Sequence, residues 1–82
     1  MSKARKALKA AKENPASLSF SELRALVTAA GFSLARTSGS HHVYTKPGVV
    51  EIINLQPNGR MAKVYQVRQV LALIDKYNIE VQ

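Results

Sequence analysis

The sequence predicts an α+β domain in which helices cover one face of a three-stranded antiparallel sheet. Hydrophobic residues recur at helical spacing up to residue 31 and again after residue 63, and between residues 32 and 55 they alternate with polar residues. Short turn segments divide the alternating stretch, and connections this short favour antiparallel hairpins over parallel crossovers. At 82 residues the chain has room for one core, so we expect one domain over residues 1–82.

The N-terminal part predicts a short basic helix. Residues 3–13 carry five cations, and alanine and leucine side chains recur at helical spacing on one side. Asn14-Pro15 ends this helix, because proline disfavours helical backbone in the residue before it and donates no N–H. The lysines suit either a solvated face or an arm that contacts phosphates. We expect residues 1–15 to form this helix and the break after it, beside a core over residues 18–78; of these parts, the docking of the N-terminal helix is the one that the sequence predicts least.

A complete start signal precedes the second predicted helix. Ser19 is placed as the N-cap, Glu22 as its capping-box partner, and Leu18 is placed to contact Leu23. Gly31 stands where a residue with left-handed backbone commonly ends a helix. The helix is therefore predicted from Phe20 to Ala30.

Turn residues divide the alternating stretch into three predicted strands. They run approximately over Phe32–Thr37, Ser40–Lys46 and Val49–Leu55. Gln56–Gly59 is predicted as a loop. Apolar residues then repeat at intervals of three and four, which predicts a final helix from about Val64 to Tyr77. The predicted order is a short helix followed by α-β-β-β-α, and the two long amphipathic helices supply the apolar surface that the sheet needs on one face.

Composition narrows the classes of function. Twelve Lys and Arg residues stand against five Asp and Glu, which gives a net charge of +7 and makes a polyanion, nucleic acid first, the expected partner. The chain has no cysteine, so disulfides and cysteine-type zinc sites are excluded, and this composition fits the cytoplasm. No apolar run approaches the ~18 residues of a membrane-spanning helix, and the N-terminal stretch lacks the apolar region of a signal peptide. We expect a protein with no membrane association.

The most conspicuous polar cluster is the segment from Ser38 to His42, which holds both histidines at a predicted hairpin. Histidine can both accept and donate a proton near neutral pH, so this segment is a candidate for acid–base catalysis. It also suits an ordinary turn followed by two strand residues. Metal binding is the weakest reading, because adjacent strand residues point to opposite faces and no third ligand lies nearby in sequence. For the same reason we expect at most one of His41 and His42 to be catalytic.

Basic residues form the second candidate site. The stretch from Arg36 to Arg68 carries a net charge of +4, which suits a phosphate track as well as a solvated surface. Tyr44 and Tyr65 could stack on unpaired bases, and core packing explains them equally well.

Several segments resemble the HicA family of toxins from bacterial toxin–antitoxin pairs. The resemblance covers about residues 19 to 78 and is carried by Gly31-Phe32, Gly39-Ser40-His41-His42-Val43-Tyr44, Ile53-Asn54-Leu55-Gln56 and Lys63-Val64-Tyr65-Gln66-Val67-Arg68-Gln69-Val70. It implies an α-β-β-β-α fold like that of double-stranded-RNA-binding domains. It also implies an mRNA interferase, that is, an endoribonuclease that cleaves mRNA and is inhibited by a HicB-type antitoxin protein. An RNA-binding module of the same fold without catalytic activity is the main alternative. A protein-interaction adaptor is a further one, although it would not need the excess of positive charge.

The Gly-Ser-His segment of the family places the catalytic residue at His41, with His42 the weaker candidate. The chain departs from the common family pattern after the third strand, where Asn54-Leu55-Gln56-Pro57 stands in place of a Pro-x-His segment. We therefore expect a single catalytic histidine, with no metal and no small-molecule cofactor. The residues expected to contact the RNA are Gly39, Ser40, His42, Lys46, Arg60 and Lys63.

Overall fold

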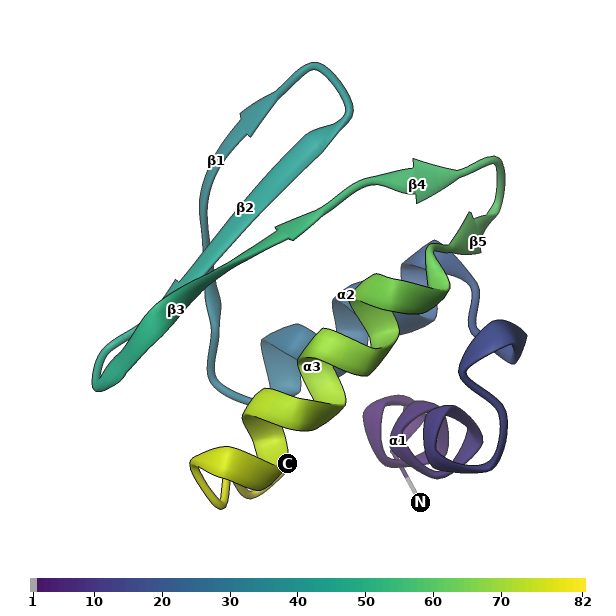
Figure 1. The fold of residues 1–82 in the computed structure, drawn as a ribbon, viewed down its shortest axis with the longest axis horizontal. Helices are drawn as coiled ribbons and strands as arrows, with labels where there is room; N and C mark the ends of the chain where they lie inside the picture. The colour runs from purple at the N-terminus through teal and green to yellow at the C-terminus, as the bar shows by residue number, and fades with distance from the viewer. Residues whose placement is uncertain (1) are drawn as a thin grey trace.

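The computed structural model describes residues 2–82 (Figure 1). Its helices are α1 (Lys3–Glu13), the short 3-10 helix η1 (Pro15–Ser17), α2 (Phe20–Ala29) and α3 (Val64–Lys76). Its strands are β1 (Ser33–Ser38), β2 (His41–Lys46), β3 (Val49–Leu55), β4 (Pro57–Asn58) and β5 (Met61–Ala62). Within these residues, none of the helices has the length and apolar character needed to cross a bilayer.

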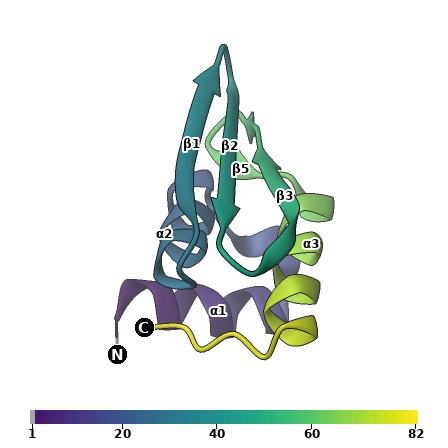
Figure 2. The same ribbon diagram turned by 90° about the vertical axis from the view of Figure 1, so that its left-hand side faces the viewer.

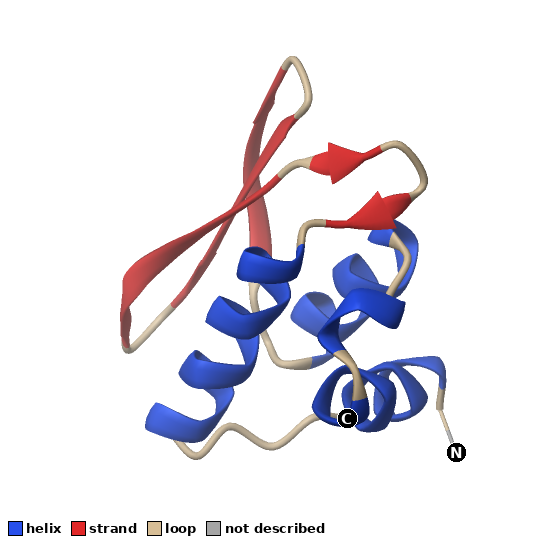
Figure 3. Ribbon diagram, turned by 45° about the vertical axis from the view of Figure 1, so that its right-hand side comes forward, coloured by secondary structure: helices blue, strands red, loops and turns tan. Residues whose placement is uncertain are grey.

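The main sheet has the antiparallel order β1-β2-β3, and the helices lie on one side of it (Figure 3). The strand side chains that face the helices build the core: Tyr44, Ile53 and Leu55 are buried, and all three belong to the same apolar cluster as the helices. The prediction of an α+β fold with α-β-β-β-α order and an additional N-terminal helix is confirmed.

The other face of the sheet is not covered by any described element. Val50 and Ile52 of β3 are 89% and 58% exposed, and every residue of the edge strand β1 is exposed. A register shift between Leu34 and Arg36 interrupts the pairing of β1 with β2, which is typical of an edge strand. The sheet therefore offers an open face opposite the helices.

Local signals fix both ends of α2 as the sequence predicts. The Ser19 hydroxyl accepts a hydrogen bond from the Glu22 N–H at 3.1 Å, and the Glu22 carboxylate accepts one from the Ser19 N–H at 2.9 Å. These hydrogen bonds from Ser19 lower the pKa of Glu22. At the other end Gly31 has a φ of 96°, and the Phe32 N–H donates to the Val27 carbonyl at 3.2 Å.

The helix α1, whose docking is the least certain from the sequence, packs against the core. Ala4, Ala7 and Ala11 are buried in the common core, because their small side chains allow a close approach of α1 to α2. The Lys3 ammonium group also donates to the Ser21 hydroxyl at 3.1 Å, and the Arg5 Nε donates to the Val81 carbonyl at 3.4 Å.

The prediction that Gln56–Gly59 forms only a loop is wrong, because this segment contains the short strand β4. This strand pairs with β5, with Pro57 opposite Ala62 and Asn58 opposite Met61. Backbone hydrogen bonds then attach the small hairpin to the start of α2, from Phe20 N to the Arg60 carbonyl and from Ala62 N to the Leu18 carbonyl, each at 3.0 Å. Two residues per strand leave no hydrophobic period in the sequence, so these contacts could not be predicted from it.

Candidate active site

The turn between β1 and β2 forms the tip of a hairpin that projects beyond the ends of the helices (Figure 2). Gly39 has a φ of 59°, and a Cβ added there would meet nothing within 4 Å. Glycine therefore serves the left-handed turn rather than a close approach within this chain, and it leaves the backbone of the turn accessible to a ligand.

The two adjacent histidines face opposite sides of the sheet, as the strand period predicts. His42 faces the helices, where its ring meets the ring of Phe20 edge-on with centroids 5.2 Å apart. Its Nδ1 lies 3.0 Å from the carbonyl oxygen of Ser40. Because a carbonyl oxygen only accepts, Nδ1 of His42 carries the proton in this contact. These two contacts give His42 a role in holding the hairpin turn onto α2.

His41 faces the open side of the sheet and is exposed. Its Nδ1 lies 3.3 Å from Oδ1 of Asn54 in β3. In the tautomer that donates from Nδ1 to this oxygen, Nε2 carries the lone pair and faces no partner within the described chain. This arrangement orients an imidazole whose second nitrogen is available to a substrate. Asn54 is a functional candidate that sequence reasoning missed, because its contact depends on the register between β2 and β3.

A second set of hydrogen bonds connects the turn to the start of α3. The Gln56 side chain donates to the Ser40 hydroxyl at 3.2 Å and accepts from the Lys63 ammonium group at 2.9 Å. The backbone N–H of Gln56 donates to Oε1 of Gln66 at 3.0 Å, and Gln66 is only 3% exposed. Among the expected RNA contacts, Ser40 and Lys63 are thus brought together by Gln56. Gln56 belongs to the segment Asn54–Pro57, which departs from the common family pattern of Pro-x-His.

The remaining expected contacts are placed differently. Arg60 lies in the turn between β4 and β5, and its carbonyl accepts a hydrogen bond from the N–H of Phe20 at the start of α2. Lys46 lies at the opposite end of β2, with its ammonium group against Gly31. Five residues of extended strand separate it from His41 by roughly 16 Å. The cations from Arg36 to Arg68 therefore do not form a single patch.

The tyrosines resolve into two roles. Tyr44 is 2% exposed and packs in the core, with its hydroxyl accepting a hydrogen bond from Nε of Arg24 at 2.9 Å. Tyr65, at the start of α3, is 65% exposed, so its ring is accessible to a ligand.

Comparison with known proteins decides the family. The family model described as HicA toxin of bacterial toxin-antitoxin matches residues 20–75, which is more than half of the chain. The chain belongs to the HicA toxin family. No curated protein and no solved structure matches it significantly.

Membership of the HicA family makes this chain a toxin of a toxin–antitoxin system and implies a HicB-type antitoxin as its partner. The matched segment contains the hairpin, both histidines and most of α3, whereas α1 lies outside it. The basic N-terminal helix is therefore an element of this chain beyond the family-matched part.

Two further features of this HicA chain bear on the position of the site. Within residues 2–82 no group of three or more His, Asp or Glu side chains is arranged to hold a metal ion.

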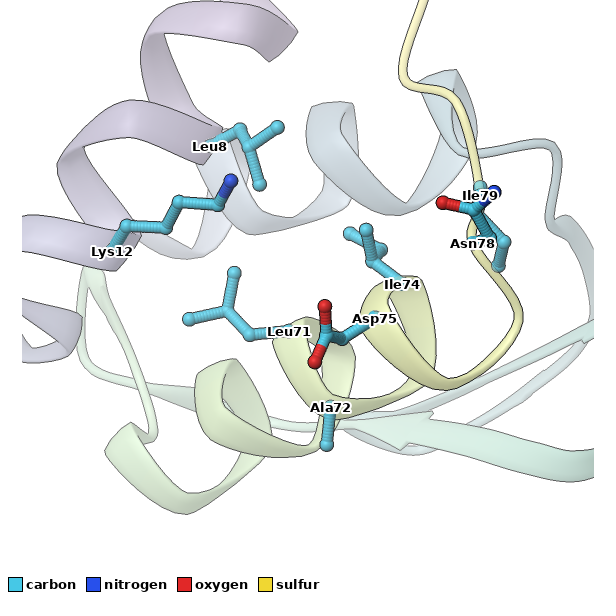
Figure 4. Close-up of a pocket in the computed structure, with 8 residues that line it drawn as sticks. All are labelled: Leu8, Lys12, Leu71, Ala72, Ile74, Asp75, Asn78 and Ile79. Carbon is cyan, nitrogen blue, oxygen red and sulfur yellow. The ribbon is translucent and has the colours of Figure 1, made fainter.

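A hollow of about 490 Å³ lies between α1 and the end of α3, with Lys12 and Asp75 at its rim (Figure 4). Apolar residues such as Leu8, Leu71 and Ile74 form much of its lining, and none of the expected site residues contributes to it. The candidate active site is consequently the exposed hairpin surface around His41.

Proposed function

We propose that this HicA-family toxin is a metal-independent endoribonuclease that cleaves mRNA with His41 as its one catalytic histidine. The observation that carries the proposal is the exposed imidazole of His41, held at Nδ1 by Asn54 and open at Nε2. An imidazole oriented through one nitrogen and free at the other is suited to proton transfer to and from a substrate.

RNA contains its own nucleophile, the ribose 2′-hydroxyl group. In the proposed reaction, Nε2 of His41 takes the proton of this hydroxyl as its oxygen attacks the adjacent phosphorus. The bond from phosphorus to the 5′-oxygen breaks, the leaving oxygen takes a proton from water, and the hydroxide formed takes up the proton held by His41. The products are a 2′,3′-cyclic phosphate and a 5′-hydroxyl end. General base catalysis of this kind contributes about 10²- to 10⁴-fold to the rate.

Cations near the turn would stabilise the negative charge that develops on the phosphoryl oxygens. Lys63 has the best support, because Gln56 links its ammonium group to Ser40, the turn residue directly before the two histidines. Arg60 is the second candidate through its position beside Phe20. Gly39 and Ser40 would contact the phosphate backbone at the turn, His42 would hold the turn in place, and the exposed ring of Tyr65 would be available to stack on a base.

The proposal is tested by incubating purified toxin with mRNA in EDTA and analysing the ends of the fragments. We expect cleavage to persist and the 5′ ends to carry hydroxyl groups. His41→Ala should abolish cleavage, whereas His42→Ala should reduce it less, with circular dichroism showing that both variants are folded. Cleavage that EDTA abolishes and Mg²⁺ restores would overturn the metal-independent mechanism. Binding of RNA without cleavage would favour the non-catalytic RNA-binding module.

A further inference from the structure

A second hollow, of about 560 Å³, runs along the outer side of α2. It is bounded by α1 through Lys3, by α2 through Phe20 and Arg24, and by β2 through Tyr44. The rest of its lining consists of small residues of α2, namely Ser21, Ala25, Thr28 and Ala29. We call this hollow the α2 groove.

The α2 groove has cations on its walls and no carboxylate in its lining. Arg24 uses Nε to donate to the Tyr44 hydroxyl, which fixes the guanidinium plane and leaves both terminal amino groups for another acceptor. Lys3 donates to the neutral hydroxyl of Ser21. Glu22 is close enough to Lys3 for their charges to interact, but no carboxylate lines the groove itself. The lining therefore carries two cations held by neutral hydrogen-bond partners, which favours an anionic ligand.

The groove and His41 lie on opposite faces of the sheet, and the turn between β1 and β2 separates them. On the helix side, the guanidinium carbon of Arg24 lies 6.0 Å from the centre of the Phe20 ring, and the same ring contacts His42. His42 in turn contacts the Ser40 carbonyl in the hairpin turn. An extended ligand at His41 would therefore have to cross the turn at Ser40 before it passes Phe20 and enters the groove.

We propose that the α2 groove binds a stretch of single-stranded RNA that flanks the cleaved bond, with phosphates at Arg24 and Lys3 and a base against Phe20. This proposal rests on the proposed function, because it takes the substrate to be RNA. Cations beside an aromatic side chain are the combination that binds single strands independently of sequence. Lys3 belongs to α1, so the helix outside the family-matched part would extend the substrate site of this toxin.

The experiment measures binding of 2′-O-methyl oligonucleotides, which lack the nucleophile and cannot be cleaved. A trinucleotide is compared with an oligomer of about ten nucleotides, a length within the usual range of single-strand sites. Lys3→Ala is matched by Lys9→Ala, which removes the same charge from an exposed position of α1 outside the groove. We expect Lys3→Ala to weaken binding of the longer oligomer by about fivefold and to flatten its salt dependence by about 0.7, with trinucleotide binding unchanged. Equal effects of the two substitutions would overturn the groove proposal.

Arg24 needs its own comparison, because it also holds Tyr44. Arg24→Gln removes the charge and the hydrogen bond, whereas Tyr44→Phe removes only the hydrogen bond. The longer oligomer should bind more weakly to Arg24→Gln than to Tyr44→Phe, and equal losses would show that Arg24 acts only through Tyr44. The two proposals fail in different ways. If the proposed function is wrong, wild-type toxin leaves mRNA uncleaved. If only the groove proposal is wrong, the toxin still cleaves mRNA, and Lys3→Ala weakens binding of the long and the short oligonucleotide equally or not at all.

Discussion

The buried side-chain amide of Gln66 accepts a hydrogen bond from the backbone N–H of Gln56 at 3.0 Å. This bond attaches the segment after β3 to the first turn of α3. Since the side chain of Gln56 bridges Ser40 and Lys63, the position of Gln66 determines where these two groups meet. Gln66 is thus a positioning residue for the candidate site, although it lies in the core.

Gln66→Leu should destabilise the fold, because the N–H of Gln56 would lose its partner. An unsatisfied buried polar group costs about 1–3 kcal/mol in unfolding free energy. Chemical denaturation measures this loss, and Gln69→Leu, three residues further along α3 and less buried, provides the matched control. Equal stabilities of the two variants would contradict the assigned role.

Asn54→Ala should reduce RNA cleavage without preventing it, because the imidazole of His41 remains and loses the partner that orients it. We expect a fall in rate on the order of tenfold, smaller than the roughly 10²- to 10⁴-fold that general base catalysis contributes. Single-turnover cleavage measured across pH provides the test. A profile identical in shape and height to that of the wild type would show that Asn54 does not act on His41.

Acid should weaken the attachment of β3 to α3. Glu51 accepts hydrogen bonds from Lys76 at 2.6 Å and from the Tyr77 hydroxyl at 2.5 Å, and these lower its pKa from 4.5 to about 2. The folded state therefore binds this proton less readily than the unfolded state. The stabilisation is complete above pH 4.5 and is lost as the pH falls through about 2.

Glu51→Gln should remove this part of the pH dependence, whereas Glu13→Gln, at an exposed position of α1, should retain it. Unfolding midpoints between about pH 5 and pH 2 measure the difference. Direct titration of the Glu51 carboxyl by NMR gives a second measurement, and an ordinary pKa there would refute the prediction.

RNA binding should depend steeply on salt, since each phosphate neutralised on a single strand contributes about −0.7 to the slope of log K against log salt concentration. Arg60→Ala and Lys63→Ala should each flatten this slope by less than one unit. Lys9→Ala, in the exposed face of α1, is the charge-matched control. A wild-type slope near zero would mean that the charge of +7 does not serve RNA binding.

The HicB-type antitoxin should cover the open face around His41. The chain has two histidines, so His42→Phe leaves His41 as the one imidazole whose modification is measured. The phenylalanine keeps an aromatic ring in contact with Phe20. In the complex, diethyl pyrocarbonate should modify His41 much more slowly than in the free toxin, and RNA cleavage should stop. A complex that is inactive while His41 stays freely modifiable would indicate inhibition by blocking the RNA path elsewhere.

Short-range signals in the sequence predicted much of the fold, and contacts between distant segments account for what was missed. The capping box of Ser19 and the turn at Gly31 are determined by neighbouring residues, so the ends of α2 could be placed closely. The contact between His41 and Asn54 spans thirteen residues and depends on strand register. The docking of α1 depends on how closely its alanines approach α2, a packing property that the helical period does not contain.

The expectation for Lys46 shows a different limitation. Lys46 was grouped with Arg60 and Lys63 because it is charged and lies beside a predicted turn. That turn, however, follows the end of β2 that is remote from His41. Strand length alone could have separated it from His41, since both residues belong to one predicted strand.

Within β2 and β3, the side chains that build the core and those proposed for catalysis lie on opposite faces. Tyr44, Ile53 and Leu55 face the helices, while His41 and Asn54 face away from them. A substitution can therefore disarm the toxin without unfolding it. Such a disarmed copy would retain most of the surface that an antitoxin recognises, and by sequestering the antitoxin it would release intact toxin in the same cell. In a cell that carries both alleles, the inactive allele would then increase the activity of the intact toxin instead of having no effect.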